Sequence, residues 1–98
     1  MLQFTWDAAK SEANLLERGF DFEFASLIFE GRTLEQEDQR QHYGERRIVA
    51  IGRADGFEVT VVYTDRLDAA GRLERRIISA RRSNRYERQA YQEAIQTS

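Results

Sequence analysis

Residues 72–82 read Arg-Leu-Glu-Arg-Arg-Ile-Ile-Ser-Ala-Arg-Arg, and the fold depends on this stretch because it has the pattern of a strand that runs directly into a helix. Alternation predicts two faces: Arg76, Ile78, Ala80 and Arg82 on one, and Arg75, Ile77, Ser79 and Arg81 on the other. Asn84 and Glu87 have the spacing of a capping box, so the closing helix should begin near Asn84. Arginine side chains are therefore expected to gather where the strand ends.

Two further strands are predicted before this one, at residues 46–53 and 57–64, with a hairpin turn at Ala54-Asp55-Gly56 between them. In the second of these strands, alternation places Phe57, Val59, Val61 and Tyr63 on one face and Thr60, Val62 and Thr64 on the other. Residues 65–71 should form a longer turn into the arginine strand.

The N-terminal part is predicted to supply a short edge strand at residues 2–6 and two helices. Asp7 is the expected N-cap of the first helix and Gly19 its end. Its apolar positions are Ala9, Ala13 and Leu16, and its polar row is Lys10, Asn14 and Glu17. A second helix should begin at Asp21 and pack its aromatic and aliphatic side chains into the core before Gly31.

Residues 32–44 are mostly polar, with Glu35, Glu37, Asp38, Gln39, Arg40, Gln41 and His42 in close succession. Residues 33–37 could pair as an edge strand, and the rest should be a mobile loop. The acidic residues are most simply solvated, but they would oppose RNA if they lay near the arginine strand. The expected fold is α+β: an antiparallel sheet of about four strands, with two N-terminal helices, one C-terminal helix and a partly open face.

Length and composition restrict the possible functions. The 98 residues are enough for one domain, spanning 1–98, with a single core. The absence of cysteine and the presence of one histidine argue against thiol catalysis and metal sites, so no cofactor is expected. Apolar residues nowhere continue long enough to span a bilayer, and no membrane contact is expected. We expect a soluble, cytoplasmic protein.

The charge is unevenly distributed along the chain. Residues 1–71 hold 8 basic and 14 acidic side chains, a net charge of −6, whereas residues 72–98 hold 7 basic and 3 acidic ones, a net charge of +4. Only Lys10 among the 15 cations is a lysine. This bias favours bidentate recognition of phosphate or carboxylate, although an arginine-rich genome would produce the same composition.

The chain resembles the BrnT family of toxins from bacterial type II toxin–antitoxin systems. The resemblance covers most of the chain and rests on Trp6-Asp7-x-x-Lys10-x-x-x-Asn14, Gly19 with residues 22–25, Gly44-Glu45-x-Arg47, Ile51-Gly52-Arg53, residues 61–64, residues 76–82, Glu87-Arg88 and Tyr91. The chain departs from the family pattern at Leu16-Glu17-Arg18, where a Lys-His pair usually precedes the glycine.

The resemblance implies a fold similar to that of RelE and ParE toxins and a metal-independent endoribonuclease activity that inhibits translation. It also implies neutralisation by a BrnA-like antitoxin with a ribbon-helix-helix domain, so that operator DNA is bound only through the antitoxin. The alternative, from another functional class, is a non-catalytic binding module that serves as antitoxin partner and transcriptional co-repressor.

Cleavage of RNA without a metal needs a base for the 2′-hydroxyl, donors for the charged phosphorane and an acid for the leaving 5′-oxygen. Arginine suits the second task, and Arg81 and Arg82 are the best candidates, with a solvated edge pair as the alternative. Arg81 should face the open side of the sheet and Arg82 the other side, where it binds the RNA backbone or a partner. The other catalytic candidates are Lys10 (or a surface salt bridge), Glu45 (base, or structural partner of Arg47) and His42 (proton transfer, or an idle loop residue). The candidates for binding the RNA backbone are Arg47, Arg53, Arg76 and Arg82.

Overall fold

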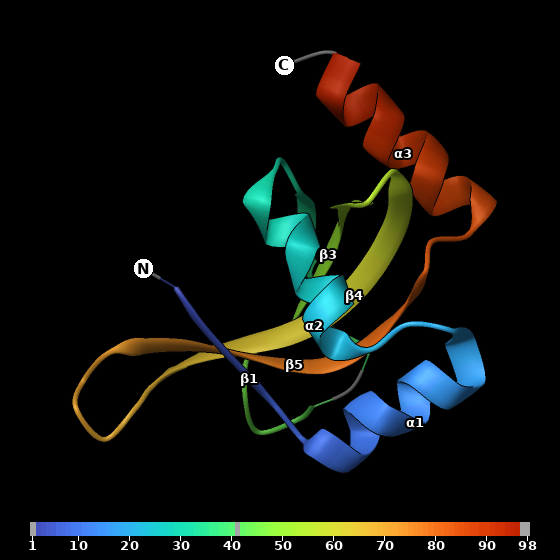
Figure 1. The fold of residues 1–98 in the computed structure, drawn as a ribbon. Coiled ribbons are helices and arrows are strands. Elements are labelled where there is room, and N and C mark those ends of the chain that lie inside the picture. Colours follow the sequence, from blue (N-terminus) through green and yellow to red (C-terminus); the bar gives the residue numbers. More distant parts are fainter. Residues whose placement is uncertain (1, 41, 97–98) are drawn as a thin grey trace.

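The protein is described here by a computed structural model that covers residues 2–40 and 42–96; Gln41 of the polar loop lies outside the described residues. The architecture is α+β, as the sequence predicts. Figure 1 shows the elements in chain order: β1 (Gln3–Trp6), α1 (Ala8–Arg18), α2 (Phe22–Ala25), the 3-10 helix η1 (Ser26–Glu30), β2 (Leu34–Glu37), β3 (Ile48–Ala54), β4 (Phe57–Leu67), β5 (Leu73–Arg82) and α3 (Arg85–Gln96).

The sheet has five strands in the order β1-β5-β4-β3-β2, one more than the expected number of about four. Strands β2, β3, β4 and β5 pair with one another in antiparallel fashion, and β1 pairs in parallel with β5. The sheet is therefore mixed rather than purely antiparallel. Local periodicity predicts a strand at residues 2–6 but carries no information on which distant segment that strand will pair with.

A β-bulge changes the expected alternation of β5. Val62 of β4 faces Ser79, whereas the next residue, Tyr63, faces Ile77, so Ile78 is the extra residue on β5. As a result, the helix-covered face carries Arg75, Ile77, Ala80 and Arg82, and the opposite face carries Arg76, Ser79 and Arg81. The sequence prediction of strict alternation across residues 75–82 is wrong because one inserted residue reverses the sides.

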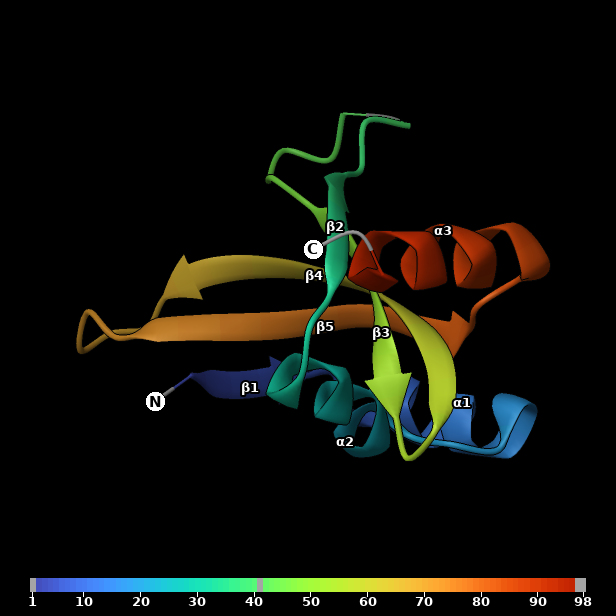
Figure 2. The same cartoon turned by 90° about the horizontal axis from the view of Figure 1, so that it is seen from above.

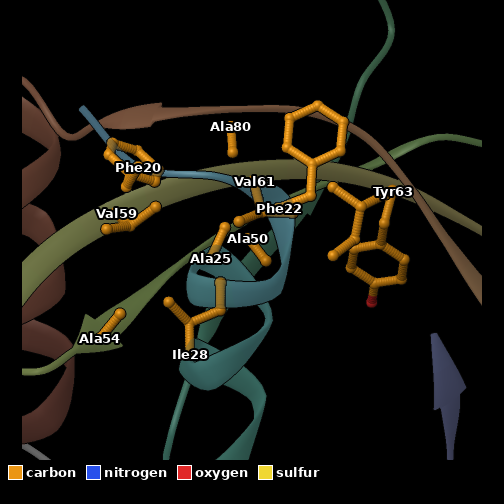
Figure 3. Packing of buried hydrophobic residues seen from close by; sticks show 11 residues of the cluster. Phe20, Phe22, Ala25, Ile28, Ala50, Ala54, Val59, Val61, Tyr63 and Ala80 are labelled. Atoms are coloured by element: carbon orange, nitrogen blue, oxygen red, sulfur yellow. The ribbon is translucent and has the colours of Figure 1, made fainter. Parts of the chain in front are cut away.

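The hydrophobic core lies between the sheet and the segment formed by α2 and η1. Figure 3 shows Phe22, Ala25 and Ile28 of that segment beside core residues of the sheet. The fully or almost fully buried sheet residues are Ala50, Ala54, Val59, Val61, Tyr63, Ile77 and Ala80. The helix α1 lies on the same side, and α3 lies over the other face (Figure 2).

The helix α1 begins and ends as predicted, but it packs on a different face. The Asp7 carboxylate accepts hydrogen bonds from the first turn, and Gly19 ends the helix with a positive φ of 87°. The predicted apolar row is exposed, with Leu16 80% exposed, whereas Ser11 and Asn14 are buried. The Ser11 Oγ accepts from the Phe22 amide at 2.9 Å and the Asn14 Nδ2 donates to the Phe20 carbonyl at 2.8 Å, so α1 is held by polar contacts to the segment that follows.

The second predicted helix is split into α2 and η1. Asp21 caps α2 as expected, and the chain tightens into a 3-10 helix from Ser26. Within η1, Ile28 is fully buried against Gly52 of β3, where a Cβ atom would lie 2.8 Å from the Ile28 Cβ. A glycine at this position therefore allows η1 to approach the sheet closely.

The closing helix α3 has the predicted capping box. The Asn84 amide donates to Glu87 Oε1 at 2.8 Å, and the Glu87 amide donates to Asn84 Oδ1 at 2.9 Å. The buried Tyr91 anchors the helix, since its hydroxyl donates to the Arg32 carbonyl at 2.9 Å. No helix in the described ranges is long and apolar enough to cross a membrane.

Candidate functional site

A concave surface of about 790 Å³ lies on the sheet face opposite α1 and α2, and we call it the open-face depression. Its lining comes from β2 and the residues after it, from β3, β4 and β5, and from the start of α3. The polar side chains important for its chemistry are Asp38, Arg40, Ser79, Arg81, Tyr86 and Glu87. It is the place where the arginine strand, the polar loop and the closing helix meet.

Arg81 is held at the rim of this depression by a carboxylate. Its Nη1 and Nη2 atoms donate to the two Glu87 carboxylate oxygens at 2.7 and 2.8 Å, and its side chain is 45% exposed. The hydrogen bonds from Arg81 lower the pKa of Glu87, and those to Glu87 raise the pKa of Arg81. The guanidinium is thus charged, fixed in orientation and reachable from solvent, with a carboxylate in the position that a phosphate could take.

Arg40 is a second guanidinium at the same depression. Its Nε and Nη2 atoms each lie 2.8 Å from an oxygen of the buried Asp38 carboxylate. These hydrogen bonds hold the pKa of Asp38 down at about 2. The charge of Arg40 acts to lower the pKa of Arg81, so the two cations are within electrostatic reach of each other.

Three of the predicted site residues line a neighbouring hollow of about 660 Å³, which we call the loop depression. His42, Glu45 and Arg47 lie there, and residues 37–39 line both depressions. Glu45 accepts from the Arg47 Nε at 3.0 Å, and the Arg47 guanidinium lies 3.9 Å from the centre of the Tyr43 ring. The structure thus brings these three residues together beside the Arg81 site, with Glu45 paired to Arg47.

Two other predicted residues lie elsewhere. Lys10 is exposed on α1, on the opposite side of the sheet from the open-face depression, and lines neither depression. Arg82 also faces the helix side, where its guanidinium lies 4.6 Å from the centre of the Phe57 ring. The arginine pair at the strand end is therefore divided between the two faces, and Lys10 is not brought together with Arg81.

The remaining predicted arginines lie on the same sheet face as Arg81 but outside its depression. Arg53 donates to the Glu58 carboxylate at 3.2 Å and lies 5.7 Å from the centre of the Tyr91 ring. Arg76 is half-buried and faces Thr64 in the register of the sheet. Both lie outside the open-face depression, so only an RNA strand that extends past it would reach them.

Acidic residues also line the open-face depression. Asp38 and Glu87 contribute paired carboxylates to it. Glu35 and Glu37 of β2 line it as well but face the helix-covered side in the register of the sheet, where Glu35 accepts from the Tyr63 hydroxyl. In the charged state, these groups oppose a polyanion. In the part of the chain that the structure describes, no group of three or more histidine, cysteine, aspartate or glutamate residues is arranged to hold a metal ion.

Sequence reasoning missed Arg40 and Tyr86 and recognised Glu87 only as a capping residue. Tyr86 is 71% exposed at the edge of the depression. The spacing Asp38-x-Arg40 was an available local signal, since the two residues form a bidentate pair. The pairing of Arg81 with Glu87 depends on how the helix leaves the strand, which no short pattern reveals.

Comparison with known families supplies the class of protein. The sequence model of a family described as ribonuclease toxin, BrnT, of type II toxin–antitoxin system matches residues 6–87. The chain belongs to the BrnT family. A search of curated proteins finds no match.

Membership of the BrnT family makes the chain the toxin of a type II toxin–antitoxin system, with ribonuclease activity, RNA as its target and an antitoxin as its partner. The matched region runs from Trp6 to Glu87 and so includes Arg81, the polar loop and strands β2 to β5. Both partners of the Arg81–Glu87 ion pair therefore lie within the part of the chain that matches the BrnT family model.

Proposed function

We propose that this protein is a metal-independent endoribonuclease that cuts RNA in the open-face depression and so inhibits translation. The observation that supports this proposal is the bidentate Arg81–Glu87 pair, which presents a fixed guanidinium at a concave surface beside a second cation, Arg40. The two-oxygen geometry that Glu87 satisfies is the geometry of a phosphodiester, so a phosphate group of RNA would exchange with this carboxylate.

In the proposed reaction, a base removes the proton of a 2′-hydroxyl, and the 2′-oxygen attacks phosphorus. The phosphorane carries its negative charge against Arg81 and Arg40, and the bond to the 5′-oxygen breaks as that oxygen takes a proton. Arg81 remains cationic throughout because a guanidinium is protonated at any physiological pH. Glu45 and His42 in the adjoining loop depression are the candidates for base and acid.

Arg82 is not part of this proposed cleavage site, because it faces the other side of the sheet. Arg47 is close enough to hold the RNA backbone in the loop depression, and Arg53 and Arg76 would contact a longer strand. A role for Lys10 requires RNA to extend around the sheet to α1, and the Lys10→Ala variant tests it.

We further propose that the antitoxin is BrnA-like, with a ribbon-helix-helix domain, and that operator DNA is bound through it rather than by this chain. The supporting fact is that both cations of the open-face depression are already paired with carboxylates, so this surface suits a duplex polyanion poorly. The neighbouring gene is the simplest check: it should encode a short ribbon-helix-helix protein.

A second function is favoured by one observation. Both cations of the open-face depression are already paired, Arg81 with Glu87 and Arg40 with Asp38, so the surface is largely neutralised in this conformation. A protein that only binds its antitoxin and acts as co-repressor would have no need for a free guanidinium. The two functions differ in whether purified, antitoxin-free protein cuts RNA.

The deciding experiment incubates the antitoxin-free protein with RNA in EDTA. We expect cleavage, and Arg81→Ala should slow it by at least about 100-fold, the usual effect of removing one donor to a developing oxyanion. The melting temperature should change little because Arg81 forms an exposed ion pair. The matched control is Arg72→Ala in the turn before β5, an exposed arginine outside both depressions. Intact RNA at high protein concentration would support the non-catalytic function instead.

A further inference from the structure

A groove of about 390 Å³ on the helix side of the sheet is mostly apolar and open to solvent. It lies between α1, the segment joining α1 to α2, and the strand ends at Phe57 and Arg82. Leu15 and Phe57 stand on its two sides and are 47% and 46% exposed. We call this surface the helix-side groove.

The apolar surface continues beyond the groove. Phe24 lines both the helix-side groove and a neighbouring hollow that contains Leu27, which is 37% exposed. Leu15, Leu27 and Phe57 are thus three of the seven large hydrophobic side chains that are exposed in the described residues. All three line hollows that also contain Phe24. Contiguous exposed apolar surface of this kind marks a site of protein contact.

The charged residues at the rim of the groove indicate the charge that a partner should carry. Arg18 is fixed in place because its Nη1 donates to the Ala80 carbonyl at 2.8 Å, and Arg82 lies against the Phe57 ring. Neither guanidinium forms an ion pair within residues 2–40 and 42–96. The carboxylate on this rim, Asp21, already accepts from the Phe24 amide as a helix cap. The groove therefore offers two oriented cations against one occupied acid.

We propose that the helix-side groove is the docking surface for an acidic, apolar segment of the antitoxin. An apolar side chain of that segment enters between Leu15 and Phe57, and a neighbouring carboxylate pairs with Arg82. The occupant is not a second copy of this chain, because a two-fold contact would bring Arg18 and Arg82 of both copies together. The proposal rests on the antitoxin partner that family membership implies, and it concerns the face of the sheet opposite the proposed RNA site.

The test measures binding of the tagged protein to the antitoxin that is encoded in the same operon. Phe57→Asp and Arg82→Glu should each weaken the dissociation constant at least about tenfold, as expected for residues at the centre of an interface. The matched controls, Leu67→Asp and Arg72→Glu, place the same changes in and beside the exposed β4–β5 turn, and they should stay within about twofold. Unchanged affinity of both groove variants would overturn the proposal.

RNA cleavage by antitoxin-free Phe57→Asp protein separates this inference from the proposed function. If Phe57→Asp cleaves RNA as fast as the unmodified protein but no longer binds the antitoxin, the result supports the helix-side groove as the docking surface and shows that the variant is folded. If the parent itself cuts no RNA but the groove variants still lose the antitoxin, the docking surface stands and the ribonuclease mechanism falls. Should Phe57→Asp fail to fold, Leu15→Asp on the exposed side of α1 replaces it with the same expectation. A homodimer that the groove variants dissociate would overturn the proposal in favour of self-association.

Discussion

Arg81 and Arg82 are consecutive residues with separate surroundings. Arg81 pairs with Glu87 over the open-face depression, and Arg82 packs on Phe57 in the helix-side groove. The division follows from strand geometry, because neighbouring side chains of a strand point to opposite faces. At this strand end, a single residue step separates the proposed RNA site from the proposed antitoxin surface.

Glu87 has two roles that one substitution can separate. Glu87→Gln keeps an oxygen that can accept from the Asn84 amide, so the cap is retained, but it removes the negative charge that competes with phosphate for Arg81. We expect this variant to bind an uncleavable, 2′-deoxy-blocked RNA more tightly than the parent, as measured by fluorescence anisotropy at fixed salt. Glu93→Gln removes the same charge later in α3 and is the control. Weaker binding by Glu87→Gln would show that the carboxylate itself contacts the RNA.

The same variant should also change the response of stability to pH. The folded state lowers the pKa of Glu87 from its usual value of 4.5. A lowered carboxylate pKa adds stability above that value, and this contribution is lost as the pH falls through the folded-state pKa. The melting temperature of the unmodified protein should therefore decrease more than that of Glu87→Gln when the pH is lowered below 4.5.

Among the elements, α1 shows how polar contacts can set the orientation of a helix. The Asn14 amide and Ser11 hydroxyl serve backbone groups of the α1–α2 connection, and the leucine-containing side of the helix is left in solvent. An apolar stripe predicts the buried side of a helix only when hydrophobic packing determines its orientation. In α1, the need to satisfy buried backbone groups determines it.

Substitutions in α1 test this account. Asn14→Ala should lower the free energy of unfolding by about 1–3 kcal/mol, because the Phe20 carbonyl loses its buried donor. Leu16→Ala, at the position predicted to be in the core but 80% exposed, should change it by no more than about 0.5 kcal/mol. Urea denaturation with an unchanged m-value measures both. A larger loss for Leu16→Ala than for Asn14→Ala would contradict the observed packing.

Features with a local cause were predictable from sequence, and those with a distant cause were not. The caps at Asp7 and Asn84 and the alternation along β4 each follow from residues within a few positions of one another. The parallel pairing of β1, the bulge at Ile78 and the proximity of Arg40 to Arg81 each depend on segments far apart in sequence. The sequence therefore predicted Arg81 as a site candidate, but it did not predict that Arg40 and Glu87 lie beside it.

For the whole molecule, the net charge of −2 conceals a division between surfaces. In the open-face depression two arginines are paired with Asp38 and Glu87, whereas the rim of the helix-side groove has two arginines and one aspartate. RNA binding at the first surface should thus depend on a few oriented contacts rather than on a broad positive field.

The salt dependence of RNA affinity tests that expectation. If Arg81 and Arg40 neutralise two phosphates of a single strand, the logarithm of the association constant should fall with the logarithm of salt concentration with a slope of about −1.4, or about −0.7 per contact. Arg81→Ala should reduce the slope by about half. Arg72→Ala, outside the depression, should leave it unchanged. A slope several times steeper would indicate a binding surface much larger than the one proposed.

Because of the bulge at Ile78, the number of residues that follow it in β5 determines which face of the sheet Arg81 and Arg82 each occupy. Five residues separate Ile78 from the helix cap at Asn84, and their alternation is what turns Arg81 toward one face and Arg82 toward the other. Deletion of Ser79 or Ala80, or insertion of one residue beside them, would exchange the faces of the two guanidinium groups while leaving both arginines in the chain. Homologues that keep the same chemistry should therefore vary in residue identity here far more freely than in length.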